Sequence, residues 1–149
     1  MKRNRKQTGF TLLEIMVVLV IIGILATAVM LNIGGDVDRA TITRAKADIS
    51  TLTTALERYK MDNFVYPSTE QGLPALVRKP TSDPEPRNYK QGGYVNKLEK
   101  DPWGRDYQYV FPGEHGEFDL FSLGADGQLG GDGANQDIGN WDENLERDR

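Results

Sequence analysis

The chain has 149 residues, with 18 Lys and Arg against 22 Asp and Glu, so its net charge is −4. It has no cysteine and a single histidine, His115, which argues against disulfides, thiolate chemistry, histidine-based triads and multi-histidine metal sites. The first nine residues hold four cations, so removing them from a chain of net charge −4 would leave −8, and such an acidic remainder argues against nucleic acid as a partner.

A long apolar stretch follows this basic leader. Residues 15–31 are apolar except for Gly23 and Thr27, and they carry no charge. As a helix, residues 10–31 would be about 33 Å long, close to the thickness of a bilayer's hydrocarbon core. The leader cations would hold the N-terminus in the cytoplasm, which places the rest of the chain outside. A cleaved secretory signal is the alternative, for which residues 26–28 offer only a weak cleavage site.

Glu14 is the one anion near the start of the apolar stretch. A carboxylate deep in a bilayer costs on the order of 2.5–3.5 kcal/mol on insertion scales, so a compensating partner is expected. The alternative is that Glu14 lies near the headgroups and extends its carboxylate to water.

The helix is predicted to continue beyond the apolar stretch. Apolar residues recur at steps of three and four, with charged residues between them. This stripe, which is predicted to pack on a sheet, consists of Ile42, Ala45, Ile49, Leu52, Leu56 and Tyr59. Gly34 and Gly35 are expected to bend or melt the helix, and Asp36 to cap its second half.

The segments after this helix combine one short helix with loops. Pro67 disfavours helical geometry before it, and Ser68 with Gln71 forms a capping-box pattern that predicts a short helix over residues 68–77. Pro74 limits that helix or lies in its first turn. Residues 79–93 read as loop, and residues 101–104, Asp-Pro-Trp-Gly, as a tight turn that presents an indole.

Two apolar segments after that turn predict an antiparallel hairpin. Residues 107–111 and 118–123 read as strands, joined by a turn at residues 112–116. A third strand is expected either at residues 94–95 or at residues 138–141. The predicted fold class is therefore α+β, with a long N-terminal helix on a small antiparallel sheet of about three strands.

Residues 123–141 form an acidic, glycine-rich segment. Glycine permits turns that wrap backbone carbonyls around one point, and hard oxygen ligands there suit Ca²⁺. Asp126 and Asp137 span the length of an EF-hand loop, but Gln128 and Gly130 stand at its third and fifth positions, and no helix precedes it. Composition alone leaves two readings open, a flexible acidic loop or a calcium site.

The residues Gly9-Phe10-Thr11-Leu12-Leu13-Glu14, followed by an apolar helix, resemble the class III signal of type IV pilins and pseudopilins. The resemblance implies that a prepilin peptidase cleaves between Gly9 and Phe10 and methylates the new amine of Phe10. It also implies that Glu14 pairs with the Phe10 ammonium of a neighbouring subunit, which would cancel two charges in an apolar setting.

Further motifs resemble the major pseudopilins of bacterial type II secretion systems, a family of the type IV pilin-like superfamily. They are residues 59–63, 66–73, 101–104, 121–127 and 137–141, so the resemblance spans nearly the whole chain. It implies one bound Ca²⁺, with side-chain oxygens from Asp126 and Asp137 and backbone carbonyls from Leu123 and Gln128. Asn135 or Asp132 would supply the remaining ligand. Related chains commonly carry a proline in the region of residues 29–32, whereas this chain has none before Pro67.

The resemblance implies a structural filament subunit and no enzyme. Residues 1–9 would be the removed leader, residues 10–33 the transmembrane and filament-core helix, and residues 34–149 the periplasmic domain of an inner-membrane protein. The expected partners are further copies of the chain, minor pseudopilins, the inner-membrane assembly platform, prepilin peptidase and the membrane. The filament is expected to drive export of folded proteins across the outer membrane. The alternatives are a type IV pilin of a surface filament and a monomeric, membrane-anchored calcium-binding module.

Overall fold

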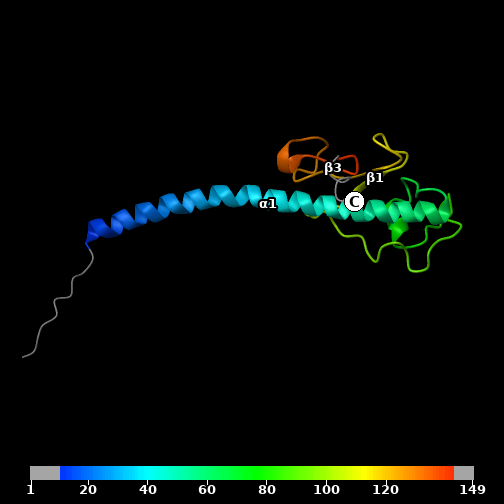
Figure 1. The fold of residues 1–149 in the computed structure, drawn as a ribbon, viewed down its shortest axis with the longest axis horizontal. Helices are drawn as coiled ribbons and strands as arrows, with labels where there is room; N and C mark the ends of the chain where they lie inside the picture. Colours follow the sequence, from blue (N-terminus) through cyan, green and yellow to red (C-terminus); the bar gives the residue numbers. More distant parts are fainter. Residues whose placement is uncertain (1–10, 143–149) are drawn as a thin grey trace, which may run out of the picture. The chain divides into compact units, whose positions relative to one another are not determined.

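The computed structural model describes residues 11–142, and the side chains of residues 11–25 and 38–142. The element order is α1 (Leu12–Asn63), the 3₁₀ turn η1 (Leu73–Leu76), β1 (Gln108–Val110), β2 (Asp119–Ser122), the 3₁₀ turn η2 (Gly133–Asn135) and β3 (Ile138–Gly139) (Figure 1). The chain divides into two compact units, and the boundary falls between Asp38 and Arg39. Gly9 and Phe10 lie outside the described residues.

The first unit contains the N-terminal part of α1. The helix begins at Leu12, and Thr11 caps it, because the Glu14 amide donates to the Thr11 hydroxyl at 3.2 Å. The large apolar side chains from Leu12 to Leu25 are exposed, from 46% for Val18 to 80% for Leu12. Within the described residues, no helix combines the length and the hydropathy that a membrane span requires.

Helix α1 runs without interruption through Gly34 and Gly35, so the local melting predicted there is wrong. Glycine in a helix interior costs roughly 1 kcal/mol relative to alanine, which does not by itself end a helix. Asp36 lies inside the helix, so the prediction that it caps a separate second half is wrong as well.

Within the second unit, α1 ends in a left-handed residue. Phe64 has φ 64°, and its amide donates to the Lys60 carbonyl at 2.7 Å, which is the single hydrogen bond of an αL cap. The side-chain amide of Asn63 also donates to the Tyr59 carbonyl at 3.0 Å. The helix therefore stops shortly before Pro67, at the place that the sequence predicted.

The sheet is antiparallel throughout and has the order β1-β2-β3. Tyr109 lies opposite Leu120 in the β1–β2 pair, and Ser122 lies opposite Ile138 in the β2–β3 pair. The predicted hairpin is confirmed, and the third strand is the one predicted near residue 138. Residues 94–95 instead lie beside η1, where the amides of Tyr94 and Val95 donate to the Leu76 carbonyl at 2.7 and 3.2 Å.

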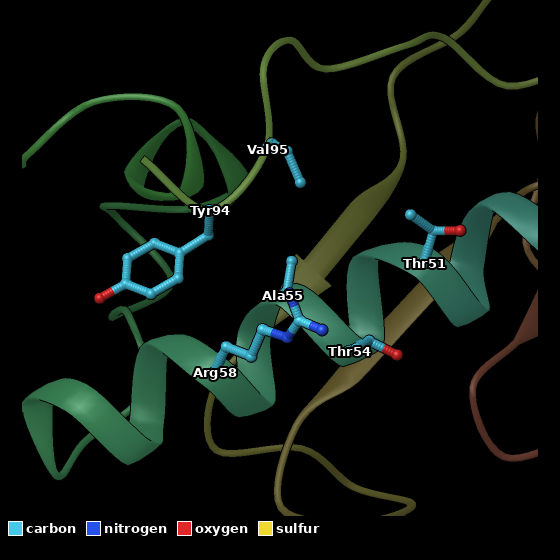
Figure 2. A pocket seen from close by; sticks show the side chains of 6 residues that line it. All are labelled: Thr51, Thr54, Ala55, Arg58, Tyr94 and Val95. Atoms are coloured by element: carbon cyan, nitrogen blue, oxygen red, sulfur yellow. The ribbon is translucent and has the colours of Figure 1, made fainter. Parts of the chain in front are cut away.

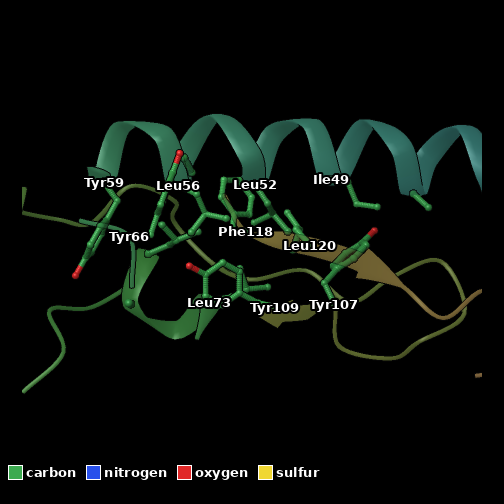
Figure 3. Packing of buried hydrophobic residues seen from close by; sticks show 14 of the residues in the cluster. Ile49, Leu52, Leu56, Tyr59, Tyr66, Leu73, Tyr107, Tyr109, Phe118 and Leu120 are labelled. Atoms are coloured by element: carbon green, nitrogen blue, oxygen red, sulfur yellow. The ribbon is translucent and has the colours of Figure 1, made fainter. Parts of the chain in front are cut away.

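The core lies between the second-unit part of α1 and one face of the sheet (Figure 3). The predicted stripe is buried from Ala45 to Tyr59, with Ile42 packed at its margin. The helix contributes Ile49, Leu52, Leu56 and Tyr59, and the sheet side contributes Tyr107, Tyr109, Phe118, Leu120 and Ile138. The fold class predicted from the stripe and the hairpin is confirmed in this unit.

The helix predicted over residues 68–77 is wrong in length, because only η1 forms there. The capping box itself is present: the Gln71 amide donates to the Ser68 hydroxyl at 3.2 Å, and the Ser68 amide donates to the Gln71 side-chain oxygen at 3.1 Å. Gly72 then takes φ 56°, which is outside helical geometry, and Pro74 follows it within η1. The capping box of Ser68 and Gln71 therefore closes a single turn, and η1 forms after it as a separate 3₁₀ turn.

Leu120→Ala is expected to lower the free energy of unfolding by about 2–5 kcal/mol, because Leu120 is fully buried between α1 and the sheet. The measurement is urea unfolding of the full chain in detergent, followed by the fluorescence of Trp103 and Trp141. Leu129→Ala is the matched control, since Leu129 is 79% exposed and its truncation should change stability by less than about 0.5 kcal/mol. Equal effects of the two substitutions would contradict the packing described.

Candidate functional site

The β2–β3 loop, residues 123–137, contains all the candidate metal ligands. Its two ends meet because Ser122 and Ile138 are directly paired in the sheet. Antiparallel partners have Cα atoms roughly 4.5–5.5 Å apart, so Leu123 and Asp137, the next residue on each strand, are neighbours at the mouth of the loop. The sheet thus brings together two candidate ligands that are far apart in the sequence.

A tight turn at the start of the loop brings in two more candidates. The Gly127 amide donates to the Leu123 carbonyl at 3.2 Å, which closes the turn. The Gln128 amide donates to Oδ1 of Asp126 at 3.0 Å, so the Asp126 carboxylate is fixed beside the backbone of Gln128. Leu123, Asp126 and Gln128 therefore belong to one hydrogen-bonded turn.

Asp137 carries the most informative atom of the loop. Its Oδ2 accepts a hydrogen bond from the Gly130 amide at 2.8 Å, whereas its Oδ1 is buried and has no hydrogen-bond partner in the described structure. A buried carboxylate oxygen without a donor is unfavourable by roughly 1–3 kcal/mol or more. A hard cation would satisfy this oxygen, and the carboxylates and carbonyls of the loop are the ligands that Ca²⁺ prefers.

The two candidates for the remaining ligand, Asp132 and Asn135, lie in the second half of the loop. The Asn135 amide donates to the Asp132 carbonyl at 3.1 Å, and the Ala125 amide donates to the Ala134 carbonyl at 2.8 Å. A Cβ at Gly124 would lie 2.8 Å from the Asn135 carbonyl oxygen, so the backbone of Asn135 is packed against the start of the loop. The side chains of Asn135 and Asp132 are both exposed.

Among the side chains that the structure describes, those of residues 11–25 and 38–142, no group of three His, Cys, Asp or Glu gathers as a metal site. Any cation in the β2–β3 loop would therefore depend on backbone carbonyls as well as on carboxylates. The donor set of Leu123, Asp126, Gln128 and Asp137 has this composition. It fits calcium better than zinc, which prefers nitrogen and sulfur ligands.

Two residues that the sequence analysis missed connect the loop to the rest of the domain. Asp101 is only 3% exposed, and its Oδ2 accepts a hydrogen bond from the Ser122 hydroxyl at 2.6 Å. The guanidinium of Arg105 donates to the carbonyls of Gly124 and Ala125 at 2.7 and 2.9 Å. The sequence did contain a signal, since a carboxylate and a guanidinium flank the Trp-Gly turn, which was predicted only to present its indole.

Asp119 closes the β1–β2 turn. It accepts hydrogen bonds from the backbone amides of Glu114 and His115, at 2.9 and 3.0 Å, and lies 3.0 Å from Nδ1 of His115. Burial works against its charge, but the hydrogen bonds from His115 and Glu114 outweigh burial, so the pKa of this carboxyl lies below its usual value. The His115 ring stacks on Trp141, with ring centroids 4.0 Å apart, and so joins this turn to the segment after β3.

A shallow groove of about 280 Å³ lies elsewhere, between α1 and residues 94–95 (Figure 2). Ala55, Val95 and the Tyr94 ring give it an apolar floor, and Arg58 lies along it. The hydroxyls of Thr51 and Thr54 donate to the carbonyls of Ala47 and Ser50 in the helix. The lining therefore offers no nucleophile with a neighbouring base, and the groove is not an active site of that kind.

A long N-terminal helix packed on a three-stranded antiparallel sheet defines a pilin-like protein. Residues 32–141 match the family model described as "Type II secretion system (T2SS), protein G", and residues 4–30 match the "Prokaryotic N-terminal methylation motif". The chain belongs to the type II secretion system protein G family, and it is a structural pseudopilin.

Several relatives are similar to this chain in sequence over nearly its whole length. The type II secretion system core protein G of Vibrio cholerae is 61% identical over 141 residues, which cover 95% of this chain and 96% of the relative. The protein of the same name from Pseudomonas aeruginosa is 56% identical, over 94% of this chain and 99% of the relative. The crystal structure of the major pseudopilin of enterohaemorrhagic Escherichia coli is similar with a TM-score of 0.66, at 48% identity over 74% of this chain and 94% of that one.

Proposed function

We propose that the chain assembles through its N-terminal helix into the periplasmic filament of a type II secretion system, which drives export of folded proteins across the outer membrane. The observation that carries this proposal is the exposed apolar surface of α1 from Leu12 to Leu25. An apolar surface of this size has to be covered by lipid or by other helices. Membership of the pseudopilin family favours a filament in which the helices of further copies of the chain cover this apolar surface.

Before assembly, the same surface would anchor the protein. Residues 10–33 span the inner membrane, residues 1–9 face the cytoplasm, and residues 34–149 lie in the periplasm. The match of residues 4–30 to the N-terminal methylation motif supports processing by prepilin peptidase between Gly9 and Phe10, with methylation of Phe10. In the filament, the Glu14 carboxylate pairs with the Phe10 amine of a neighbouring copy.

The β2–β3 loop binds one Ca²⁺ in this proposal. Asp126 and Asp137 supply carboxylate oxygens, Leu123 and Gln128 supply carbonyls, and Asn135 or Asp132 completes the set. The unpartnered, buried Oδ1 of Asp137 supports this assignment. Calcium supplies no reaction here: it binds the folded loop in preference to the unfolded one, and so stabilises the domain.

The filament would need partners in addition to further copies of the chain. We expect minor pseudopilins in the assembly and an inner-membrane platform that adds subunits. A surface-exposed type IV pilin is the less favoured alternative, because family membership points to type II secretion. A monomeric calcium-binding module is also disfavoured, because family membership points to a pseudopilin.

Mass spectrometry of the mature chain from the secreting bacterium tests the proposed processing. The expected mass is that of residues 10–149 with one added methyl group, because cleavage removes the leader and methylation modifies Phe10. Cells without prepilin peptidase serve as the control and should contain the full 149-residue chain. A mature chain that begins at Met1, or after residue 28, would contradict the processing.

Crosslinking then separates a filament from a monomeric module. Cysteines introduced into residues 12–25 add the only thiols of the chain, since the natural sequence has none. Oxidation of intact cells should give a ladder of multimers if the helices bundle. Monomers and random dimers alone would exclude the filament.

A further inference from the structure

Arg105 holds the β2–β3 loop from the outside. Its guanidinium reaches the loop across the sequence and donates from two nitrogens, to the Gly124 carbonyl at 2.7 Å and to the Ala125 carbonyl at 2.9 Å. A planar guanidinium with two fixed donors sets direction as well as distance. These two hydrogen bonds therefore fix the backbone of the loop between Leu123 and Asp126.

We call the Arg105 guanidinium and its two hydrogen bonds to the loop the clamp. The turn that carries Arg105 is itself rigid. Asp101 is buried, and its Oδ1 accepts hydrogen bonds from the amides of Arg105 and Trp103 at 2.8 and 3.1 Å. The Asp101 amide in turn donates to the Arg105 carbonyl at 2.8 Å. Oδ2 of Asp101 holds Ser122, the β2 residue that precedes the loop. Arg105 therefore acts from a turn that is fixed to the same strand as the loop.

Gly127 leaves room for the Arg105 guanidinium because it has no Cβ. It has φ +71°, and a Cβ at this position would lie 2.6 Å from Nε and 2.7 Å from Cζ of Arg105. The guanidinium thus packs directly on the Gly127 backbone, between the proposed ligands Asp126 and Gln128. Any side chain at position 127 would push Arg105 away.

We infer that Arg105 is a positioning residue that keeps the β2–β3 loop in its calcium-binding conformation before the ion arrives, and so raises the affinity for Ca²⁺. This inference rests on the calcium site proposed above. The carbonyls that Arg105 takes, those of Gly124 and Ala125, differ from those assigned to calcium, Leu123 and Gln128. The same turn therefore holds the guanidinium and the ion through separate oxygens.

Two effects of Arg105 on calcium binding have opposite signs. A fixed cation near the site repels Ca²⁺ and lowers the affinity. A preformed loop raises it, because the entropy of ordering the chain is lost in folding and not at binding. The two hydrogen bonds to carbonyls and the packing on Gly127 make preorganisation the larger effect. The sign of the affinity change on removing the charge therefore tests the inference.

Calorimetric titration of the full chain in detergent with CaCl₂ gives this sign. Arg105→Gln is expected to weaken Ca²⁺ binding by at least about tenfold, and Arg105→Lys, which keeps the charge but loses the two-pronged geometry, should also weaken it. In chelator, amide exchange of residues 123–137 should be faster in both variants than in the natural chain. Unchanged or tighter binding by Arg105→Gln, or binding by Arg105→Lys equal to that of the natural chain, would overturn the inference.

Gly127→Ala tests the clamp without changing any charge, and it decides the matter if Arg105→Gln does not fold. It should weaken Ca²⁺ binding as Arg105→Gln does. Gly133→Ala is the matched control, since Gly133 has φ +60° and open space where a Cβ would lie, and its affinity should stay within about twofold of the natural value. Equal loss in both alanine variants would overturn the clamp.

The outcomes also separate this inference from the calcium proposal on which it rests. A natural chain that shows neither heat on addition of Ca²⁺ nor a change in melting temperature with EGTA would refute the calcium site, and the clamp's role in affinity with it. Binding by the natural chain with unchanged binding by Arg105→Gln and Gly127→Ala would refute the clamp alone.

Discussion

Glu14→Gln is expected to abolish filament assembly while leaving the periplasmic domain folded. Glu14 lies in the first turn of α1, where its amide is capped by Thr11, and it is the only acid among residues 11–25. If its carboxylate pairs with a neighbouring Phe10 amine in an apolar filament core, neutralising it leaves an uncompensated buried cation. Breaking one partner of a buried ion pair costs roughly 3–5 kcal/mol, or about two to four orders of magnitude in association at each contact.

Glutamine is the informative substitution at this position. The pattern Thr11-x-x-Glu14 is a capping-box sequence, so a polar residue at position 14 can serve the helix start without any neighbour. Glutamine keeps that capacity and loses only the charge, whereas alanine loses both. Glu14→Gln and Glu14→Ala should therefore be equally defective in the pairing account.

The measurement is the yield of sheared filaments, together with the crosslinked ladder from cysteines in α1. Glu70→Gln, an exposed acid of the second unit, is the control and should assemble normally. Normal filaments from Glu14→Gln, with a defect only in Glu14→Ala, would show that Glu14 acts as a helix cap. The pairing with Phe10 would then be wrong.

Removing calcium should produce the second large effect. At free Ca²⁺ a thousand times the dissociation constant, the ion would stabilise the folded domain by about 4 kcal/mol. For a domain of this size that is on the order of 10–30 °C in melting temperature. Chelation with EGTA should lower the melting temperature of the natural chain by this amount, measured by scanning calorimetry of the full chain in detergent.

The variants Asp126→Ala and Asp137→Asn should lose most of the rise that calcium produces. Asp137→Asn has a second expected result, which follows from the unpartnered Oδ1. In EGTA it should be at least as stable as the natural chain, because it removes the charge from a carboxylate whose buried Oδ1 has no hydrogen-bond partner, and an amide oxygen can still accept from Gly130. Asp106→Asn changes the same charge at an exposed position and should leave the calcium response intact. A natural chain whose melting temperature ignores EGTA would refute the calcium site.

The sequence predicted those parts of the fold that depend on local periodicity. The stripe from Ile42 to Tyr59 repeats with the period of a helix, and burial of one helix face is what that period records. The hairpin followed from two apolar segments around a Pro-Gly turn. The short second helix failed because Ser68 and Gln71 satisfied each other within one turn, so the capping signal was real but the helix did not propagate past Gly72.

The candidate site was only partly predictable for a similar reason. Asp126 and Asp137 were found because they belong to motifs of a known family, and the sheet does place Leu123 and Asp137 at one mouth. Asp101 and Arg105 act on Ser122, Gly124 and Ala125, which are 19 to 21 residues away in the sequence. Such contacts produce no periodic pattern in the sequence, and only the folded structure reveals them.

The brevity of β3 has a mechanical consequence. Strand β3 has two residues, Ile138 and Gly139, and Asn140 extends its contact with β2, because its amide donates to the Leu120 carbonyl at 2.9 Å and its side-chain oxygen accepts from the Leu120 amide at 2.9 Å. Closing the β2–β3 loop, residues 123–137, costs several kcal/mol of chain entropy, and this short edge strand opposes that cost with few contacts of its own. Under load or heat, this edge should therefore peel first. Strand β3 would separate from β2 while helix α1 stays folded.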